Sequence, residues 1–258
     1  MSRAGAAVAL LVFARAAAAQ TIVLSDGTRE VPVDLARLPR ARLALRDPTD
    51  GGRAKTLLGP RLADALAALP PPDGADAIAV RCDDGWLSLI PIPFVHRYSS
   101  AVLAIAEGTR AHPIGAPRGP VYLAFPTEAA SDRAGDAPLA DNGWAWAVAS
   151  IEYVRLAAVR AKLDLPRGAP ALAAQGRQLF ERRCLHCHAI RGAGGLAGWD
   201  LAQPNVLRYR DEQRVRGYVL DPRRYLREAR MPSFAGKLAP SDIDALVAYL
   251  RALVPTRR

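Results

Sequence analysis

Two parts of the chain differ in the spacing of their apolar positions. From residue 21 to about residue 163, short apolar runs end at Gly, Asp or Pro, which is typical of strands and turns. These runs are Thr21–Leu24, Ala77–Val80 and Val121–Phe125. One amphipathic helix, expected over residues 57–69, interrupts them, because Leu62, Leu66 and Leu69 recur at helical spacing before three prolines. The pattern predicts a mixed α/β domain over residues 20–163.

The second part, residues 164–258, shows helical spacing. Residues 164–174 contain two prolines and a glycine and are expected to form a linker. Near the end of the chain, Ser241 is the expected N-cap of a helix over residues 241–250. The apolar stripe of this helix consists of Ile243, Leu246, Val247 and Leu250. The chain is therefore predicted to be an α+β two-domain protein whose second domain is all-α.

The first nineteen residues resemble a secretory signal peptide. Arg3 precedes an apolar run over residues 6–14, and Ala17–Ala19 fits a small-residue cleavage site. The run is too short to span a bilayer, and no later stretch approaches the roughly 20 apolar residues of a membrane helix. We expect a periplasmic protein without an integral membrane segment once residues 1–19 are removed. Arg15 leaves open the alternative that the leader stays as an amphipathic anchor.

The chemistry of the second part centres on the sequence Cys184-Leu185-His186-Cys187-His188. C-x-x-C-H is the attachment pattern of a c-type heme, because two thiols at i and i+3 lie on one face of a turn and the next residue offers an imidazole to iron. A structural zinc site would need a second ligand pair, which the sequence lacks. A thioredoxin-like redox pair would need a following βαβ pattern.

Met231 is the expected sixth ligand of the iron. The chain has two methionines, and Met1 leaves with the predicted leader. Pro232 favours an extended backbone at Met231, which suits a loop residue that points inward; packing against a core is the alternative. His186 is expected to point outward, and His96 and His112 are expected to be ordinary surface or loop histidines.

Residues from about 170 to 253 resemble class I cytochrome c. The matching motifs follow that family's order: Gly176 and Phe180, the glycine-rich loop Gly192–Gly198, the helix end Tyr218–Pro222, the segment Met231–Phe234 and the last helix at 241–250. The resemblance implies a cytochrome c fold and a low-spin heme c with a positive midpoint potential. One covalent heme would be held by Cys184 and Cys187, with His188 proximal and Met231 distal.

One motif departs from the family. Where the family often has Gly-Pro-Asp-Leu after the glycine-rich loop, this chain has Gly198-Trp199-Asp200-Leu201. The backbone carbonyl that orients the proximal imidazole is then expected from Trp199 rather than from a proline, at the cost of rigidity.

The first domain resembles the molybdopterin-binding fold of sulfite oxidase-like oxidoreductases. The resembling segments are Val33–Pro39, Leu58–Leu66, Asp84–Trp86 with Ile90-Pro91, Val102–Ala104 with Gly108, Arg118–Leu123 and Trp146–Glu152. Active members of that family tie molybdenum to a cysteine ahead of the predicted helix, but residues 20–81 contain no cysteine. Cys82 lies in a later predicted strand and is expected to be a buried thiol. The sequence therefore indicates a scaffold or docking module without molybdopterin.

These observations indicate an exported single-heme electron carrier rather than an enzyme. The alternative is a self-contained molybdenum-dependent oxidoreductase, similar to a sulfite dehydrogenase, with the heme as its own electron acceptor. A heme-based sensor is disfavoured because Met231 would leave no open site on the iron.

The distribution of charged residues indicates where a partner is expected to bind. The chain carries a formal +10, and residues 166–258 hold 17 basic against 8 acidic side chains, a net +9. Arginines gather before the expected distal ligand, at positions 208, 210, 214, 216, 223, 224, 227 and 230. We expect a basic rim that docks an acidic redox protein rather than nucleic acid; ordinary solvated helix faces are the alternative.

Overall fold

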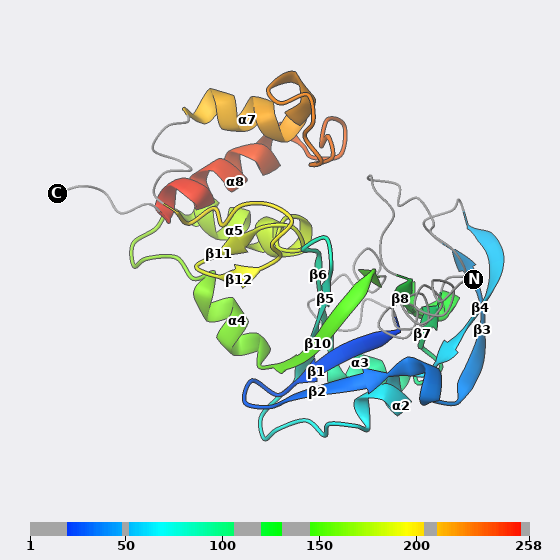
Figure 1. Ribbon diagram of the computed structural model, residues 1–258. Helices are drawn as coiled ribbons and strands as arrows, with labels where there is room; N and C mark the ends of the chain where they lie inside the picture. The colour runs from blue at the N-terminus through cyan, green and yellow to red at the C-terminus, as the bar shows by residue number, and fades with distance from the viewer. Residues whose placement is uncertain (1–19, 48–51, 106–119, 131–144, 204–210, 254–258) are drawn as a thin grey trace, which may run out of the picture. The chain divides into compact units, whose positions relative to one another are not determined.

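The computed structural model describes residues 20–47, 52–105, 120–130, 145–203 and 211–253 (Figure 1). The predicted leader, His112 and the arginines at 110, 118, 208 and 210 lie outside these residues. The chain divides into two compact units between Leu156 and Ala157. Within the described residues, none of the helices combines the length and the apolar composition that a bilayer-spanning segment needs.

A five-stranded mixed sheet is the frame of the first unit. Its strands are β1 (Thr21–Ser25), β2 (Glu30–Asp34), β5 (Ala77–Cys82), β6 (Leu87–Pro91) and β10 (Val148–Val154), in the order β2-β1-β10-β5-β6. Only the β1–β10 pair among them is parallel, and it joins the two ends of this domain in sequence. The predicted strands at residues 21–24 and 77–80 are confirmed. Cys82 closes β5 with 6% of its surface exposed, which confirms the predicted buried thiol.

A hairpin and a second sheet complete the β structure. The hairpin consists of β3 (Arg40–Asp47) and β4 (Arg53–Pro60), and the sheet of β7 (Val102–Ile105), β8 (Val121–Ala124) and β9 (Ala145–Trp146). Gly59 lets β4 approach β7 closely, because a Cβ at that position would lie 2.0 Å from the carbonyl oxygen of Leu103. A small apolar cluster fills the space between the two sets of strands: Leu43, Leu45, Val102, Ala104 and Ala124.

The helix expected over residues 57–69 is wrong in its first part. Residues 57–60 belong to β4, where Leu57 pairs with Leu43 in the antiparallel ladder with β3. The helix α2 (Leu62–Leu66) begins only after this strand. Pairing with β3, the other strand of the hairpin, overrides the helical spacing, because the ladder satisfies the backbone groups of residues 57–60. With α3 (Ile92–Arg97) and the 3-10 turns η1 (Leu35–Arg37) and η3 (Thr127–Ala130), α2 completes the elements of this unit.

The second unit is built mainly of helices. They are α4 (Leu156–Lys162, within this unit from Ala157 on), α5 (Ala171–Arg183), α7 (Glu212–Leu220), the 3-10 turn η5 (Pro222–Arg224) and α8 (Pro240–Ala252). Helix α5 begins inside the stretch that was expected to be a linker. A short hairpin of β11 (Ala189–Ile190) and β12 (Ala193–Gly194) departs from the expected all-α domain. Its two turn residues, Arg191 and Gly192, have φ values of 51° and 79°, which is the geometry of a tight two-residue β-turn.

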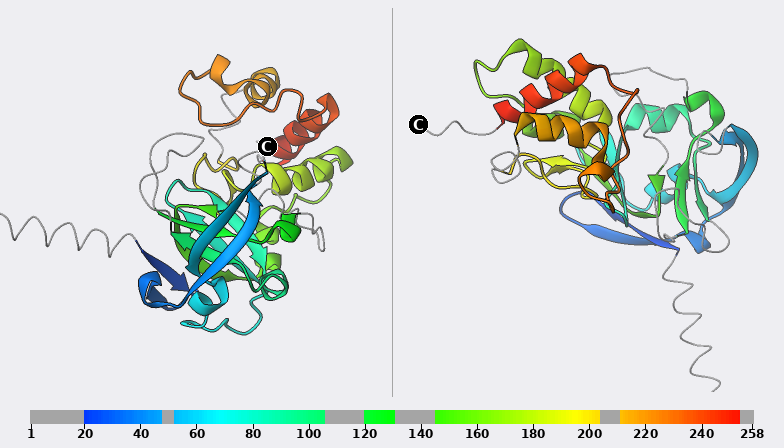
Figure 2. Two further views of the ribbon diagram at one scale, coloured as in Figure 1. Left: turned by 90° about the vertical axis from the view of Figure 1, so that its right-hand side faces the viewer. Right: turned by 90° about the horizontal axis from the view of Figure 1, so that it is seen from above.

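Helices α5 and α8 cross at close range, and all views show them side by side (Figure 2). A Cβ on Gly176 would lie 1.9 Å from the carbonyl oxygen of Ala245, so only glycine permits this approach. The ring centroids of Phe180 and Tyr249 lie 5.6 Å apart beside it. Buried residues of both helices meet in this crossing, and the heme motif begins directly after α5.

The predicted C-terminal helix is confirmed, but its N-cap is not Ser241. The cap is Ala239, and Pro240 occupies the first helical position, where its missing N–H costs nothing. The Asp242 carboxylate accepts a hydrogen bond from the Ala239 N–H at 2.9 Å, which is the contact that the third helical residue makes in a capping box.

Candidate heme site

The two cysteines lie in one turn directly after α5. The N–H of Cys184 donates to the carbonyl oxygen of Phe180 at 2.8 Å, and the N–H of His188 donates to that of Cys184 at 2.9 Å. The turn is therefore helical in its hydrogen bonding, and the cysteines at its ends are both partly buried. The structure confirms the local geometry that the C-x-x-C-H spacing predicted.

Both thiols are held in their neutral form. Burial raises the pKa of Cys184 to about 12, with a smaller contribution from the charge of Cys187. Burial also raises the pKa of Cys187 to about 11. Thiol–disulfide exchange needs a thiolate, so such pKa values disfavour a redox pair at neutral pH.

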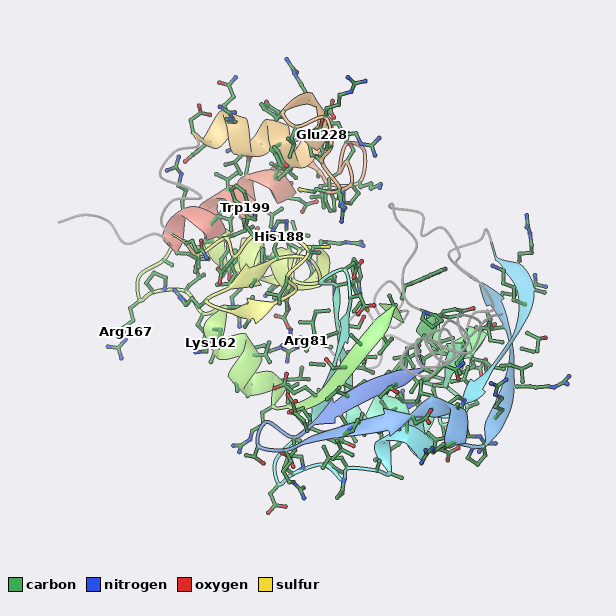
Figure 3. All side chains as sticks on the ribbon, in the orientation of Figure 1. Arg81, Lys162, Arg167, His188, Trp199 and Glu228 are labelled. Carbon is green, nitrogen blue, oxygen red and sulfur yellow. The ribbon has the colours of Figure 1, made fainter. Side chains whose placement is uncertain are left out.

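His188 is oriented by the backbone of Trp199. Its Nδ1 atom lies 3.0 Å from the Trp199 carbonyl oxygen. Because a carbonyl can only accept, Nδ1 carries the hydrogen and Nε2 keeps its lone pair. Burial lowers the pKa of His188, which favours the neutral imidazole, while the hydrogen bond to Trp199 opposes that shift. The expectation that Trp199 supplies this carbonyl is confirmed. Figure 3 labels His188 and Trp199 in the second unit.

The glycine-rich loop packs against the heme motif at distances that exclude side chains. A Cβ on Gly198 would lie 2.3 Å from Cε1 of the His188 ring, and a Cβ on Gly195 would lie 1.9 Å from the carbonyl oxygen of His186. Gly194 shows the same crowding, at 2.2 Å from the His188 carbonyl oxygen. The loop therefore needs glycine for close approach to the imidazole and to the C-x-x-C-H backbone.

Asp200 ties the end of this loop to the β11–β12 hairpin. Its carboxylate accepts hydrogen bonds from the backbone N–H groups of Arg191, Gly192 and Ala202 at 3.2, 2.7 and 2.9 Å. Sequence analysis treated Asp200 only as part of a motif and missed this role. The bond from the Ala202 N–H forms an Asx turn, in which an aspartate accepts from the backbone two residues later. The preference of aspartate for such turns was the feature of the sequence that could have indicated this role.

Met231 comes from a separate segment, between η5 and α8. The hydroxyl of Ser233 donates to the Leu220 carbonyl oxygen at 2.5 Å, and the N–H of Phe234 donates to that of Val219 at 3.2 Å. These bonds hold the segment to the end of α7, and Met231 itself is partly buried. The structure thus groups Cys184, Cys187 and His188 in one turn and places Met231 on an anchored loop.

His186 does not point outward as expected. Only 8% of its surface is exposed, and its Nε2 lies 3.3 Å from the carbonyl oxygen of Arg182. The glycine-rich loop covers this side of the turn, since Gly195 packs on the His186 backbone. By contrast, His96 is exposed in α3, as expected.

Large apolar side chains remain exposed in this unit and are consistent with a large apolar ligand. Leu196 and Trp199 in the glycine-rich loop are 70% and 64% exposed. Others follow the end of α7, ahead of Met231: Leu220, Tyr225 and Leu226. Exposed apolar groups of this size commonly mark a binding surface. Together with two neutral thiols and an imidazole whose Nε2 is available, the residues present fit a covalently attached heme.

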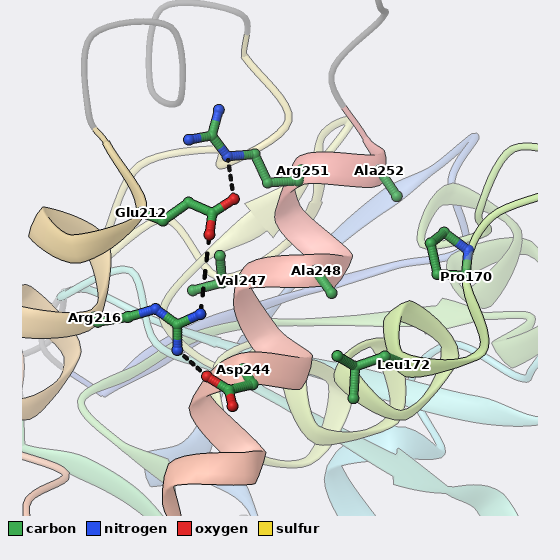
Figure 4. A pocket seen from close by; sticks show the side chains of 9 residues that line it. All are labelled: Pro170, Leu172, Glu212, Arg216, Asp244, Val247, Ala248, Arg251 and Ala252. Carbon is green, nitrogen blue, oxygen red and sulfur yellow. Dashed lines mark hydrogen bonds and ion pairs between the residues drawn. The ribbon is translucent and has the colours of Figure 1, made fainter.

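The arginines of the expected basic rim divide into two groups. Arg216 pairs with Asp244 and Glu212, and Arg251 pairs with Glu212 at 3.4 Å, so a chain of ion pairs joins α7 to α8 beside a cavity of about 570 Å³ (Figure 4). None of the four predicted heme-binding residues lines this cavity. The exposed group consists of Arg214 in α7, whose guanidinium carbon lies 5.9 Å from the ring centroid of Tyr225, and of Arg223, Arg224, Arg227 and Arg230 in and after η5.

Comparison with known proteins identifies the second unit. The cytochrome c family model matches residues 173–253. The C-terminal unit contains a c-type cytochrome domain. The chain is also 33% identical over 94 residues to cytochrome c oxidase subunit 2 of Alkalihalophilus pseudofirmus, an alignment that covers 32% of this chain and 26% of that protein. The chain thus aligns with about a quarter of the length of that relative.

The cytochrome domain establishes the general chemistry of this unit: it binds heme c and takes part in heme-based electron transfer. The family match begins inside α5, so α4 and residues 163–170 precede it. The matched residues all lie in the second unit, and the family of the first unit does not follow from them.

Proposed function

We propose that this protein is an exported electron carrier with one covalent heme c ligated by His188 and Met231. The hydrogen bond from His188 Nδ1 to the Trp199 carbonyl supports the assignment most directly, because it leaves Nε2 of a neutral imidazole available to iron. A carrier needs both axial positions filled by the protein, so that one electron moves without a substrate on the metal.

Each residue of the site has a distinct task in this proposal. The thiols of Cys184 and Cys187 would form the two thioethers, and His188 Nε2 and the Met231 sulfur would bind the iron. When bound, heme supplies the one-electron Fe(III)/Fe(II) couple. Thioether ligation favours Fe(II), so the potential should be positive. The glycine-rich loop keeps the imidazole in place and limits the access of water to it.

The ligand assignment is tested by Met231→Ala in the heme-loaded full chain. The near-infrared band of a ferric heme with histidine and methionine ligands should disappear, and the midpoint potential should fall. Leu172→Ala, which changes an exposed apolar residue in the first turn of α5, should keep the band. If Met231→Ala keeps it as well, another residue is the distal ligand.

Export is proposed from the leader-like residues 1–19. Full-length protein expressed with a heme-attachment system should appear in the periplasmic fraction, with a mass lowered by the leader. Deletion of residues 2–19 should leave it in the cytoplasm without covalent heme. An unshortened mass in the membrane fraction would instead indicate a retained anchor.

The first unit is proposed to be a scaffold or docking module without molybdopterin. Its fold resemblance to sulfite oxidase-like domains licenses no catalysis by itself, and its cysteine Cys82 is buried at the end of β5. Measurement of heme and molybdenum in the same purified sample tests this point. Stoichiometric molybdenum would overturn it and would favour the oxidoreductase alternative.

An acidic redox protein is the proposed partner, docking on the exposed arginines of the η5 region. Four arginines lie within eight residues there, from Arg223 to Arg230, with Glu228 as the acidic residue among them. Reduction of an anionic and a cationic metal complex can be compared as salt is raised. The rate with the anion should fall with salt and drop several-fold in Arg227→Glu, whereas Arg167→Glu should change it less. A rate that does not depend on salt would argue against a basic docking surface.

A further inference from the structure

Three successive backbone carbonyls at the end of α4 are bound by side chains from elsewhere in the cytochrome unit. The Arg191 guanidinium donates through Nη1 to the carbonyl oxygens of Lys162 and Asp164, each at 2.9 Å. Between them, the Tyr249 hydroxyl donates to the Leu163 carbonyl oxygen at 2.9 Å. The last carbonyls of a helix have no partner within it, so these bonds satisfy groups that would otherwise need water.

Residues 157–164, here called the strap, are fastened to α5 as well. Arg160 pairs with Glu181 at 2.6 Å, and Arg177 pairs with Asp164 at 3.0 Å. Leu163 is fully buried. The strap is therefore an ordered part of the cytochrome unit, although it lies ahead of the residues that match the cytochrome c family.

Arg191 occupies a backbone position that does not favour arginine. It is the first residue of the two-residue turn between β11 and β12, with φ at 51°. Glycine, asparagine and aspartate are the usual residues at such positions, because a larger side chain strains the backbone. The two bonds from its guanidinium to the strap are a physical reason for an arginine here.

The same residue connects the strap to the proximal ligand. The backbone N–H groups of Arg191 and Gly192 both donate to Asp200, at 3.2 and 2.7 Å. Asp200 directly follows Trp199, whose carbonyl accepts the hydrogen bond from His188 Nδ1. A short series of hydrogen bonds and one covalent step thus runs from the strap through Arg191 and Asp200 to the imidazole.

We propose that Arg191 is a positioning residue for His188, and that the strap takes part in setting the electronic character of the proximal ligand. The inference rests on the proposed role of His188. Without the guanidinium contacts, the hairpin is held less firmly, the Trp199 carbonyl is less well placed, and the Nδ1–H bond weakens. A weaker bond at Nδ1 makes the imidazole a poorer donor to Fe(III), which raises the midpoint potential.

Two substitutions in the heme-loaded full chain separate this effect from backbone strain. Arg191→Ala removes the guanidinium and keeps the strained φ, whereas Arg191→Gly removes the guanidinium and relieves the strain. The matched control is Arg182→Ala, which removes one positive charge from an exposed position of α5. Loss of a positive charge lowers the potential of a nearby heme, so both alanine variants share that contribution.

The decisive measurement is proton NMR of the reduced protein. The Nδ1–H of His188 should exchange with solvent about tenfold faster in both Arg191 variants than in the wild type, and at the wild-type rate in Arg182→Ala. The potential of Arg191→Ala should lie above that of Arg182→Ala. Wild-type exchange in both Arg191 variants would overturn the proposal, and so would equal acceleration in Arg182→Ala.

Failure of the underlying ligand assignment would look different. If His188 is an axial ligand, its ring protons in the wild-type protein carry the large ring-current shifts of a group above a heme plane. Ordinary histidine shifts in the wild type would refute the role of His188, whatever the Arg191 variants do. If one Arg191 variant fails to fold, the other still decides the question, because Arg191→Gly relieves the backbone strain that Arg191→Ala keeps.

Discussion

Gly198 offers the sharpest test of how the proximal side is packed. In Gly198→Ala, the new methyl group would lie 2.3 Å from Cε1 and 2.5 Å from Nδ1 of the His188 ring. Ordinary carbon contacts are about 3.5 to 4.0 Å, so the ring or the loop has to move by about 1 Å. Either movement strains the 3.0 Å hydrogen bond between His188 and the Trp199 carbonyl.

The expected destabilisation follows from these two effects. Overpacking a tight site costs about 1–3 kcal/mol, and loss of one hydrogen bond costs about 1 kcal/mol. Gly198→Ala should therefore lower the free energy of unfolding of the cytochrome unit by about 2–4 kcal/mol. For a domain of about 100 residues, each kcal/mol corresponds to about 4–8 °C in the midpoint of thermal unfolding.

The assay is thermal unfolding of the full chain, followed in the heme-loaded protein by heme absorbance. Gly236→Ala is the comparison, because its Cβ would meet nothing within 4 Å while its φ of +71° carries backbone strain. That strain costs about 1–2 kcal/mol and leaves the heme spectrum unchanged. A Gly198→Ala protein with wild-type stability and spectrum would refute the reasoning, since it would show that the loop does not press on the imidazole.

Three further outcomes are expected. Gly176→Ala should cost about 1–3 kcal/mol of stability by thermal unfolding and leave the heme spectrum unchanged, because a Cβ there would lie 1.9 Å from the Ala245 carbonyl in the α5–α8 crossing. In heme-free protein at pH 8, both cysteines should react with iodoacetamide more slowly than in denaturant, on the order of a hundredfold for Cys187 and a thousandfold for Cys184, because burial raises their pKa values to about 11 and about 12; equal rates in the two states would contradict this. The free energy of unfolding of heme-free protein, measured by urea titration, should fall as the pH drops below about 6.5. Burial lowers the pKa of His188, so the unfolded chain binds the proton more tightly than the folded one. A His188→Gln variant should show a smaller dependence of this free energy on pH.

Some features of the site and of α8 could be predicted from the sequence because they depend on residues that are close together in the chain. The turn that carries Cys184 and Cys187 closes within five residues, so its geometry follows from the backbone alone. The carbonyl of Trp199 was predicted because any residue at that position supplies one. The apolar stripe predicted for α8 likewise coincides with residues that are buried in the structure.

Other features depended on contacts outside the segment in which the pattern was read. Residues 57–60 became a strand because β3 pairs with them, which no helical spacing within the segment can report. His186 is buried, and Gly195 packs against its backbone carbonyl, which the spacing of the heme motif does not report. The capping of α8 moved to Ala239 because Asp242 supplies the acceptor, a choice between neighbouring residues that depends on the final backbone.

The sequence by itself determined the reactive residues of this protein: the thiols and imidazole of one turn, the one methionine besides Met1, and the basic charge of the second domain. Tertiary structure decided how those groups are held. Arg191 is one exposed arginine among many in the sequence, and only the fold brings it to the carbonyls of the strap and, through Asp200, to the residue that orients His188. The physical reason is that residue type sets which bonds a group can form, whereas three-dimensional proximity sets which of them it makes.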